Sequence, residues 1–273
     1  MEDKWIPASS VNSGRLAAIQ PDIHMYTVQI VNLFFVGTKD DWVLVDAGMP
    51  RSAEKIIREA EKLFGQHAKP KAIILTHGHF DHVGALEELV QHWDVPIYAH
   101  ELELPYLTGK RDYPEPDASV EGGLVAKMSP LFPTEAINVT EWINALPADG
   151  TIPPMPDWRW YHTPGHSPGH ISLFRPSDRV LIAGDAFVTV KQDALYKVLT
   201  QEKEFHGPPR YLTTDWKAAK SSVAQLAALE PDIAATGHGV EVTGRELNEG
   251  LHDLVSQFEE VAVPDYGRYV DDQ

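Results

Sequence analysis

The 273-residue sequence predicts an α/β-type layered fold, in which helices cover the faces of sheets. Short apolar runs typical of strands are interspersed with longer segments that have helical period. Residues 52–65 and 246–261 place their apolar side chains on one helical face, as expected of helices that pack on a sheet. Hydrophobic residues make up 43% and charged residues 23%, which fits a globular protein with a substantial core.

The first half of the chain alternates between the two kinds of element. From Met25 to Asp46 two apolar stretches flank the polar turn GTKDD and predict antiparallel strands joined by that turn. Ser52 is placed to cap the helix that follows. The next elements are a short buried strand, a helix and another strand, at residues 71–75, 84–93 and 95–100.

Residues 101–156 change character, because nine prolines interrupt this segment. We therefore expect a long insertion over the core of one domain that spans residues 1–273, and not a second domain. Asp215 is placed to cap a helix in the second half of the chain. The expected elements there are strands within 158–162, 170–176, 179–185 and 232–239, and helices at 216–230 and 246–261.

Charge and composition exclude several function classes. With 23 Lys and Arg against 40 Asp and Glu, the formal net charge is −17, which disfavours nucleic acid as a partner. No apolar run approaches the roughly 18 residues of a membrane span, and no signal peptide is evident, so we expect a cytoplasmic protein without membrane association. The absence of cysteine leaves only nitrogen and oxygen ligands for a metal.

Five predicted strands end in a glycine-containing turn that carries histidine or aspartate. Strand ends in layered α/β folds gather along one edge, so these side chains are expected to meet there. Glycine beside them lets the backbone turn sharply and approach a ligand. The residues concerned are Asp46, the pair His77 and His79, His166, Asp185 and His238.

The stretch THGHFDH, residues 76–82, predicts a site with two metals. His77 and His79 are two positions apart, which suits extended backbone that projects both rings to one side. Asp81 and His82 are adjacent and point in different directions. The first metal is expected to take His77, His79 and His166, and the second Asp81, His82 and His238, with Asp185 as a bridge. This donor set suits two Zn²⁺ per chain, with Fe or Mn as alternatives.

At this point the sequence resembles the metallo-β-lactamase fold superfamily. THGHFDH matches its HxHxDH signature, and VDAG, TPGH, AGD and TGHG match its other motifs in the same order over about residues 25–240. The resemblance implies a four-layer αββα sandwich with a dinuclear metal site at one edge and the same division of ligands. It also implies that Asp46 supports the ligand loops without binding metal.

The site and the resemblance predict a dinuclear-metal hydrolase that cleaves a small-molecule ester, lactone or thioester. A metal-bridging hydroxide is expected to attack the substrate, and Asp81 to orient it and accept its proton. A cysteine-dependent β-lactamase is excluded. The alternatives are a glyoxalase II-like thioesterase, a persulfide dioxygenase on the same scaffold, or a metal-binding protein without turnover.

Substrate specificity is expected to depend on residues 101–156 and 187–213, where no motif constrains the interpretation. Both segments are rich in aromatic residues, which either line a substrate pocket or pin long loops to the core. Exposed apolar residues in these loops would be compatible with a homodimer. The aromatic residues are Tyr106, Tyr113, Phe132, Trp142, Phe187, Tyr196, Phe205 and Tyr211.

Overall fold

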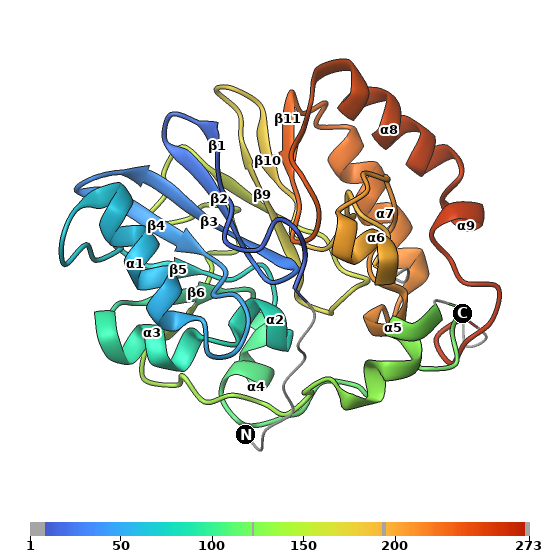
Figure 1. The fold of residues 1–273 in the computed structure, drawn as a ribbon, viewed down its shortest axis with the longest axis horizontal. Helices are drawn as coiled ribbons and strands as arrows, with labels where there is room; N and C mark the ends of the chain where they lie inside the picture. The colour runs from blue at the N-terminus through green and yellow to red at the C-terminus, as the bar shows by residue number, and fades with distance from the viewer. Residues whose placement is uncertain (1–8, 122, 193–194, 271–273) are drawn as a thin grey trace.

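The computed structural model describes residues 9–121, 123–192 and 195–270, which form four layers, helix, sheet, sheet and helix (Figure 1). Separate clusters of buried apolar side chains lie between the first helical layer and its sheet, between the two sheets, and between the second sheet and its helices. The predicted αββα sandwich is confirmed. Its layers are held together chiefly by burial of these side chains from water.

The first sheet has seven strands in chain order. Neighbouring strands are antiparallel from β1 to β4 and parallel from β4 to β7. The strands are β1 (Leu16–Gln20), β2 (Ile23–Val28), β3 (Val31–Thr38), β4 (Asp41–Val45), β5 (Ile73–Ile74), β6 (Ile97–Ala99) and β7 (Ile143–Ala145).

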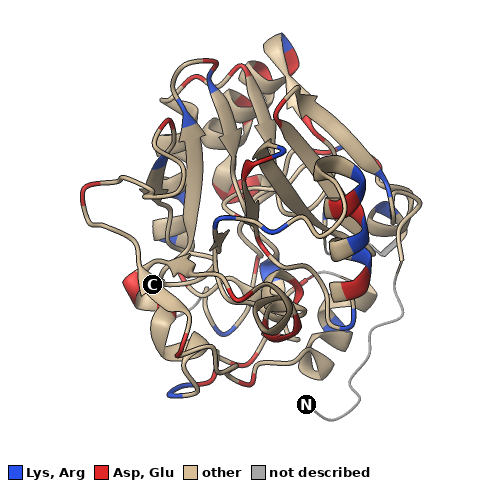
Figure 2. Ribbon diagram, turned by 90° about the vertical axis from the view of Figure 1, so that its left-hand side faces the viewer, with Lys and Arg blue, Asp and Glu red and all other residues tan. Residues whose placement is uncertain are grey.

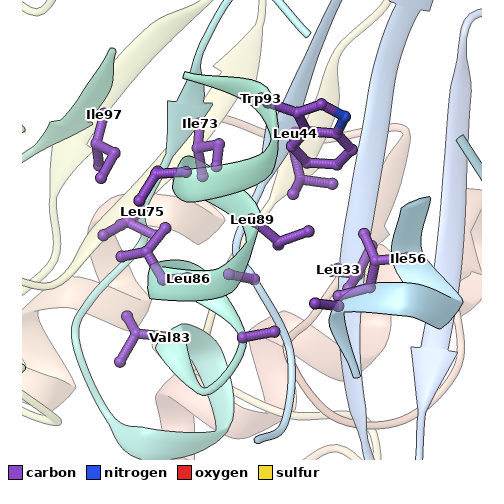
Figure 3. Packing of buried hydrophobic residues seen from close by; sticks show 14 of the residues in the cluster. Leu33, Leu44, Ile56, Ile73, Leu75, Val83, Leu86, Leu89, Trp93 and Ile97 are labelled. Atoms are coloured by element: carbon purple, nitrogen blue, oxygen red, sulfur yellow. The ribbon is translucent and has the colours of Figure 1, made fainter. Parts of the chain in front are cut away.

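Two helices cover the outer face of this sheet, α1 (Ala53–Phe64) and α3 (Leu86–Trp93). Figure 3 shows how Leu86 and Leu89 of α3 lie over apolar side chains of the strands, among them Ile73. These residues are fully buried, and burial of each such side chain contributes about 1.5–3 kcal/mol. The packing fixes the direction in which β4 and β5 end, and with it the position of the residues that follow.

The second sheet has the order β12-β11-β10-β9-β8, and only the β10–β11 pair is parallel. Helices α7 and α8 cover its outer face. The bounds are β8 (Arg159–His162), β9 (Ile171–Arg175), β10 (Val180–Ile182), β11 (Ile233–Ala235), β12 (Val242–Thr243), α7 (Trp216–Ala227) and α8 (Gly244–Ser256).

Shorter helices connect these layers. The bounds are α2 (Phe80–Val83), η1 (Glu101–Glu103), α4 (Leu104–Leu107), α5 (Gly123–Met128), η2 (Ser129–Leu131), α6 (Leu195–Thr200), η3 (Arg210–Leu212) and α9 (Phe258–Val261). Lys and Arg are intermingled with Asp and Glu on the outer helices and loops, while the strands are largely free of them (Figure 2). Within the described ranges, no helix has the length and apolar character that a membrane crossing requires.

Several local features differ from the expectations. The apolar stretch from Met25 forms two antiparallel strands, because the chain reverses at Gln29, whose φ is 59°. Ser52 precedes α1, but its hydroxyl donates to the carbonyl oxygen of Met49 at 2.6 Å and caps no backbone N–H. Asp215 does cap α7, accepting from the N–H of Ala218 at 2.8 Å. Strand β7 lies within residues 101–156, where we expected only an insertion over the core. It pairs with β6 and extends the first sheet.

Candidate metal centre

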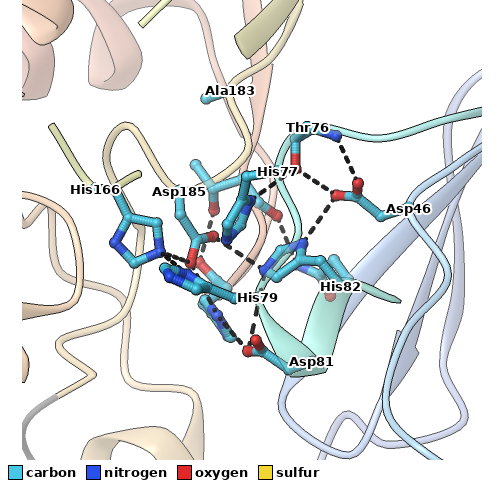
Figure 4. A network of polar contacts seen from close by, with 12 residues as sticks. Asp46, Thr76, His77, His79, Asp81, His82, His166, Ala183 and Asp185 are labelled. Carbon is cyan, nitrogen blue, oxygen red and sulfur yellow. Dashed lines mark hydrogen bonds and ion pairs between the residues drawn. The ribbon is translucent and has the colours of Figure 1, made fainter. Parts of the chain in front are cut away.

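The structure brings the seven predicted ligands together at one edge of the two sheets. β4 and β5 end just before Asp46 and the THGHFDH stretch, and β10 and β11 end just before Asp185 and His238. His166 lies in the loop between β8 and β9. All seven side chains are buried, none more than 6% exposed. Figure 4 shows how those that it labels converge on a common centre, namely His77, His79, Asp81, His82, His166 and Asp185.

The side chains form groups of the size that a metal ion requires. His77, His79 and His166 form one group, and Asp81, His82 and His238 form another. A third group joins His77 and His82 to Asp185. Within each group the potential ligand atoms lie within 4.8 Å of one another. Asp185 therefore lies where a ligand shared by two adjacent metals is expected.

Asp46 and Thr76 orient two of the histidines. Asp46 Oδ1 accepts from the Thr76 N–H, and Oδ2 accepts from the Thr76 hydroxyl, both at 2.8 Å. Because the hydroxyl hydrogen is used in this way, the Thr76 oxygen accepts from Nδ1 of His77 at 3.1 Å. Asp46 Oδ2 also accepts from Nδ1 of His82 at 2.9 Å. Both imidazoles thus keep Nε2 free for a metal.

Two further histidines are also oriented by an acceptor at Nδ1. His166 Nδ1 lies 3.3 Å from the hydroxyl of Thr213, whose hydrogen is donated to the Pro209 carbonyl oxygen. His238 Nδ1 donates to the Ile30 carbonyl oxygen at 2.9 Å. An acceptor on Nδ1 fixes the tautomer in which Nε2 carries the lone pair. Four of the five histidines therefore present Nε2 to the centre.

The first group consists of neutral imidazoles. His79 Nδ1 lies 2.9 Å from His166 Nε2, so His79 presents the opposite ring nitrogen from its neighbours. Burial lowers the pKa of His79 to about 4 and, together with the adjacent imidazoles, lowers those of His77 and His166 well below the ordinary value. Neutral imidazole is the form that binds metal.

The second group combines carboxylates with histidines. His238 Nε2 lies 3.3 Å from both Asp81 Oδ2 and Asp185 Oδ2, and His82 Nε2 lies 3.6 Å from Asp185 Oδ1. Burial alone would lower the pKa of His238, but Asp185 and Asp81 raise it to about 10. Asp185 in turn has a pKa well below its usual value because both histidines outweigh its burial. A metal in this position replaces the protons that these imidazoles otherwise hold.

Unpartnered buried atoms test whether metals fit this centre. Nε2 of His77 and His82 and Oδ1 of Asp81 and Asp185 are buried and have no hydrogen-bond partner. Leaving such atoms without a partner costs about 1–3 kcal/mol each. All four belong to the groups above, and imidazole nitrogen with carboxylate oxygen is a donor set for Zn²⁺, Fe or Mn. The residues therefore fit a two-metal centre.

Glu103, which the sequence did not single out, joins the two loops that carry the first group. Its Oε2 accepts from the N–H of Gly78 at 3.0 Å and from the Tyr113 hydroxyl. Its Oε1 accepts from the Ser167 hydroxyl at 2.7 Å and from the N–H of Gly169 at 2.8 Å. The side chain is fully buried, and burial raises the pKa of its carboxyl above the usual value.

Further residues, whose partners the sequence did not reveal, hold the second group. From the sequence, His170, near the TPGH turn, is expected to be a packing or hydrogen-bonding histidine. The backbone N–H of Asp185 donates to Nε2 of His170 at 2.8 Å, and burial lowers the pKa of this histidine to about 3, so it stays a neutral acceptor. Asn32 donates to the carbonyl oxygens of Thr236 and Gly239, both at 2.9 Å, on either side of His238. Single polar residues of this kind carry no motif, and only the fold reveals their partners.

The fold and site are those of a metal-dependent hydrolase. Comparison with known proteins identifies the family. The model of the metallo-β-lactamase superfamily matches residues 26–238. The probable metallo-hydrolase YflN of Bacillus subtilis is 48% identical over 96% of this chain and its own full length. The probable metallo-hydrolase YybB of the same organism is 32% identical over 79% of this chain and 84% of its own length. The chain belongs to the metallo-β-lactamase superfamily.

Solved structures share the fold. The BLEG-1 B3 metallo-β-lactamase covers 86% of this chain and 97% of its own, with a TM-score of 0.57 and 23% identity. The protein TTHA1623, solved in a di-iron-bound form, covers 84% of this chain and 94% of its own, with a TM-score of 0.51 and 25% identity. These likenesses agree with the sandwich architecture.

The Asp46 contacts predict that this residue supports the second group indirectly. Asp46→Asn retains the size of the side chain and tolerates the left-handed φ of 62°, but its amide cannot accept all three hydrogen bonds. We expect affinity for the second metal to fall about 10–100-fold. Zinc titration against a competing chelator measures this, with Asp41→Asn as control at the exposed first residue of β4, the strand that leads to Asp46. An unchanged affinity for the second metal would show that Asp46 does not position His82.

Proposed function

We propose that this metal-dependent hydrolase holds two metals and cleaves a small-molecule ester, lactone or thioester. The observation that carries the proposal is the pair of adjacent buried ligand groups connected through Asp185. Metals held by these residues would lower the pKa of a bound water and polarise the carbonyl oxygen of the substrate. The chain then has to place the substrate carbonyl, orient the attacking water and accept its proton.

Asp81 is the residue we propose for proton transfer. Its Oδ2 lies 3.3 Å from His238 Nε2, which fixes one edge of the carboxylate. Its Oδ1 is buried without a hydrogen-bond partner, so the carboxylate can bind a metal through one oxygen and orient the attacking water with the other. Burial opposes ionisation, but His82 and His238 lower the pKa of Asp81 below its usual value. The residue is therefore an ionised acceptor for the proton that attack releases.

The second ligand group favours hydrolysis over the alternatives. A persulfide dioxygenase on this scaffold uses fewer ligands than the seven gathered here, so the complete second group counts against it. The hydroxyacylglutathione hydrolase GloC of Haemophilus influenzae is 31% identical over 52% of this chain and 59% of its own length. That partial likeness supports acyl transfer chemistry, and thioesters stay among the proposed substrates.

Zinc is the metal we propose first, because the centre is rich in imidazole. The two carboxylates also suit Fe or Mn, and one solved relative is described in a di-iron-bound form. Metal analysis of the purified protein distinguishes these metals and counts the ions per chain.

Metal removal tests the proposed function. We expect a chelator to reduce hydrolysis of p-nitrophenyl acetate to the uncatalysed rate, and two equivalents of Zn²⁺, Mn²⁺ or Fe²⁺ per chain to restore it. The same protein is then assayed with lactones, thioesters and phosphodiesters. Binding of two metals without turnover of any substrate would favour a non-catalytic metal-binding protein. Full activity with one metal would contradict the two-metal proposal.

A further inference from the structure

A cavity beside the metal centre is lined almost entirely by apolar side chains. Asp81, Asp185 and His238 form its polar end, so the cavity begins at the ligands of the second group. The remainder of its wall comes from segments far apart in the sequence. Among these lining residues are Val125, Met128, Phe132, Gln192, Val198 and Tyr211.

The outer part of the wall comes from the two segments whose sequence carries no motif. Val125 and Met128 lie on α5, and Phe132 follows η2. Val198 lies on α6, which packs against α5. Phe132 also belongs to a small buried cluster with Tyr211 and Leu212, separate from the three main cores. These segments therefore build an apolar recess next to the centre and not only a cover for the core.

Charge around the cavity disfavours an anionic ligand. Among its lining residues, as far as the structure describes them, there is no Lys or Arg, and its two carboxylates, Asp81 and Asp185, belong to the metal centre. Away from that centre, a substrate carboxylate or phosphate would lose its hydration without gaining a cationic partner. Gln192 is 1% exposed and its Nε2 has no hydrogen-bond partner. This amide is suited to donate to an uncharged oxygen of a ligand.

We propose that this cavity is a subsite for the apolar acyl chain of an uncharged substrate. The inference rests on the proposed hydrolase function, because it places the scissile carbonyl at the second ligand group. With the carbonyl there, the chain extends between α5, α6 and η3. Each buried methylene contributes about 0.8 kcal/mol, or roughly fourfold in affinity, until the recess is filled. The enzyme would therefore select substrates by acyl length and against charge at the chain end.

The first test compares acyl esters on the zinc-loaded enzyme. We expect kcat/KM for p-nitrophenyl butyrate to exceed that for the acetate about 15-fold, since each of the two added methylenes contributes roughly fourfold. The mono-p-nitrophenyl ester of glutarate should be hydrolysed at least tenfold less efficiently than the pentanoate, which has the same chain length without the carboxylate. Equal kcat/KM values for the acetate, butyrate and pentanoate esters, or a higher value for the glutarate ester than for the pentanoate, would overturn the proposed subsite.

A matched pair of variants assigns the effect to the cavity. Met128 lines it and is 37% exposed, so Met128→Lys introduces a charge without burying it fully. We expect the ratio of kcat/KM for butyrate to kcat/KM for acetate to fall towards one in this variant. Leu131 lies on the adjacent η2, is 58% exposed and is not in the wall, so Leu131→Lys should retain the ratio. Equal ratios in both variants would contradict the assignment.

Binding of 1-octanol, measured by titration calorimetry, separates this inference from the proposed function. Octanol is uncharged and needs no turnover, and burial of its chain should give a negative heat-capacity change. Binding that Met128→Lys weakens at least tenfold and Leu131→Lys leaves intact would support the subsite even if no ester were hydrolysed. Hydrolysis of the acetate without octanol binding would retain the hydrolase and overturn the subsite.

Discussion

Asp81→Asn is expected to lower kcat for p-nitrophenyl acetate about 10²–10⁴-fold, the usual contribution of a positioned general base. Asparagine retains the size of the side chain but cannot accept the proton of the attacking water. The first ligand group, His77, His79 and His166, does not include Asp81, so the variant should still bind at least one metal. Metal content and kcat are measured on the same preparation.

Two further measurements make the Asp81 result specific. Asp157 is exposed on the surface, so Asp157→Asn changes the charge equally and should retain full kcat. Loading Asp81→Asn with excess zinc separates loss of the second metal from loss of the proton acceptor. Undiminished kcat in a variant that holds two metals would exclude the proton-transfer role. Full recovery on addition of zinc would assign Asp81 to metal binding alone.

That the candidate ligand residues lie together at one edge could be predicted, because their positions coincide with two signals. An apolar run locates the strand that leads to Asp185 or His238, and the glycine after it marks a tight turn at the end of that strand. The layered fold then brings these strand ends to one edge, irrespective of the length or conformation of the other loops. The division between the two groups followed from the spacing of His77, His79, Asp81 and His82, and the structure places them in those groups.

Local exceptions to hydrophobic periodicity could not be predicted in the same way. The reversal at Gln29 occurs within a largely apolar stretch, where no glycine, proline or cluster of polar residues marks the boundary between β2 and β3. β7 is only three residues long and pairs with β6, from which 43 residues separate it. Its strand character comes from that tertiary pairing and not from its own sequence.

The aromatic residues of the loops illustrate the same limit. Phe132 and Tyr211 line the cavity, whereas Tyr113 contacts the His79 ring and the backbone of Gly78. Both interpretations of these side chains, pocket lining and loop anchoring, therefore apply, but to different residues. Sequence could not assign them because each role depends on contacts across dozens of residues.

Glu103→Ala is expected to destabilise the metal-free protein by about 4 kcal/mol. The backbone N–H of Gly169 and the hydroxyls of Tyr113 and Ser167 lose a buried acceptor, at about 1–3 kcal/mol each, and the N–H of Gly78 loses one of its two acceptors. Urea unfolding in the presence of a chelator measures this change without a contribution from metal. Glu101→Ala, at an exposed position of the same 3₁₀ turn, should have little effect.

The position of Glu103 predicts a second effect, on the metal centre itself. One oxygen holds the loop between His77 and His79, and the other holds the loop that follows His166. A Cβ atom added at Gly169 would lie 2.8 Å from the Glu103 backbone nitrogen. The two segments are therefore in close contact, and neither can shift far towards the other. Glu103→Gln retains the volume but turns an amide nitrogen towards one pair of donors, so it should lower affinity for the first metal about 10–100-fold. Lost stability with unchanged affinity in both Glu103 variants would show that Glu103 supports the fold without positioning the ligands.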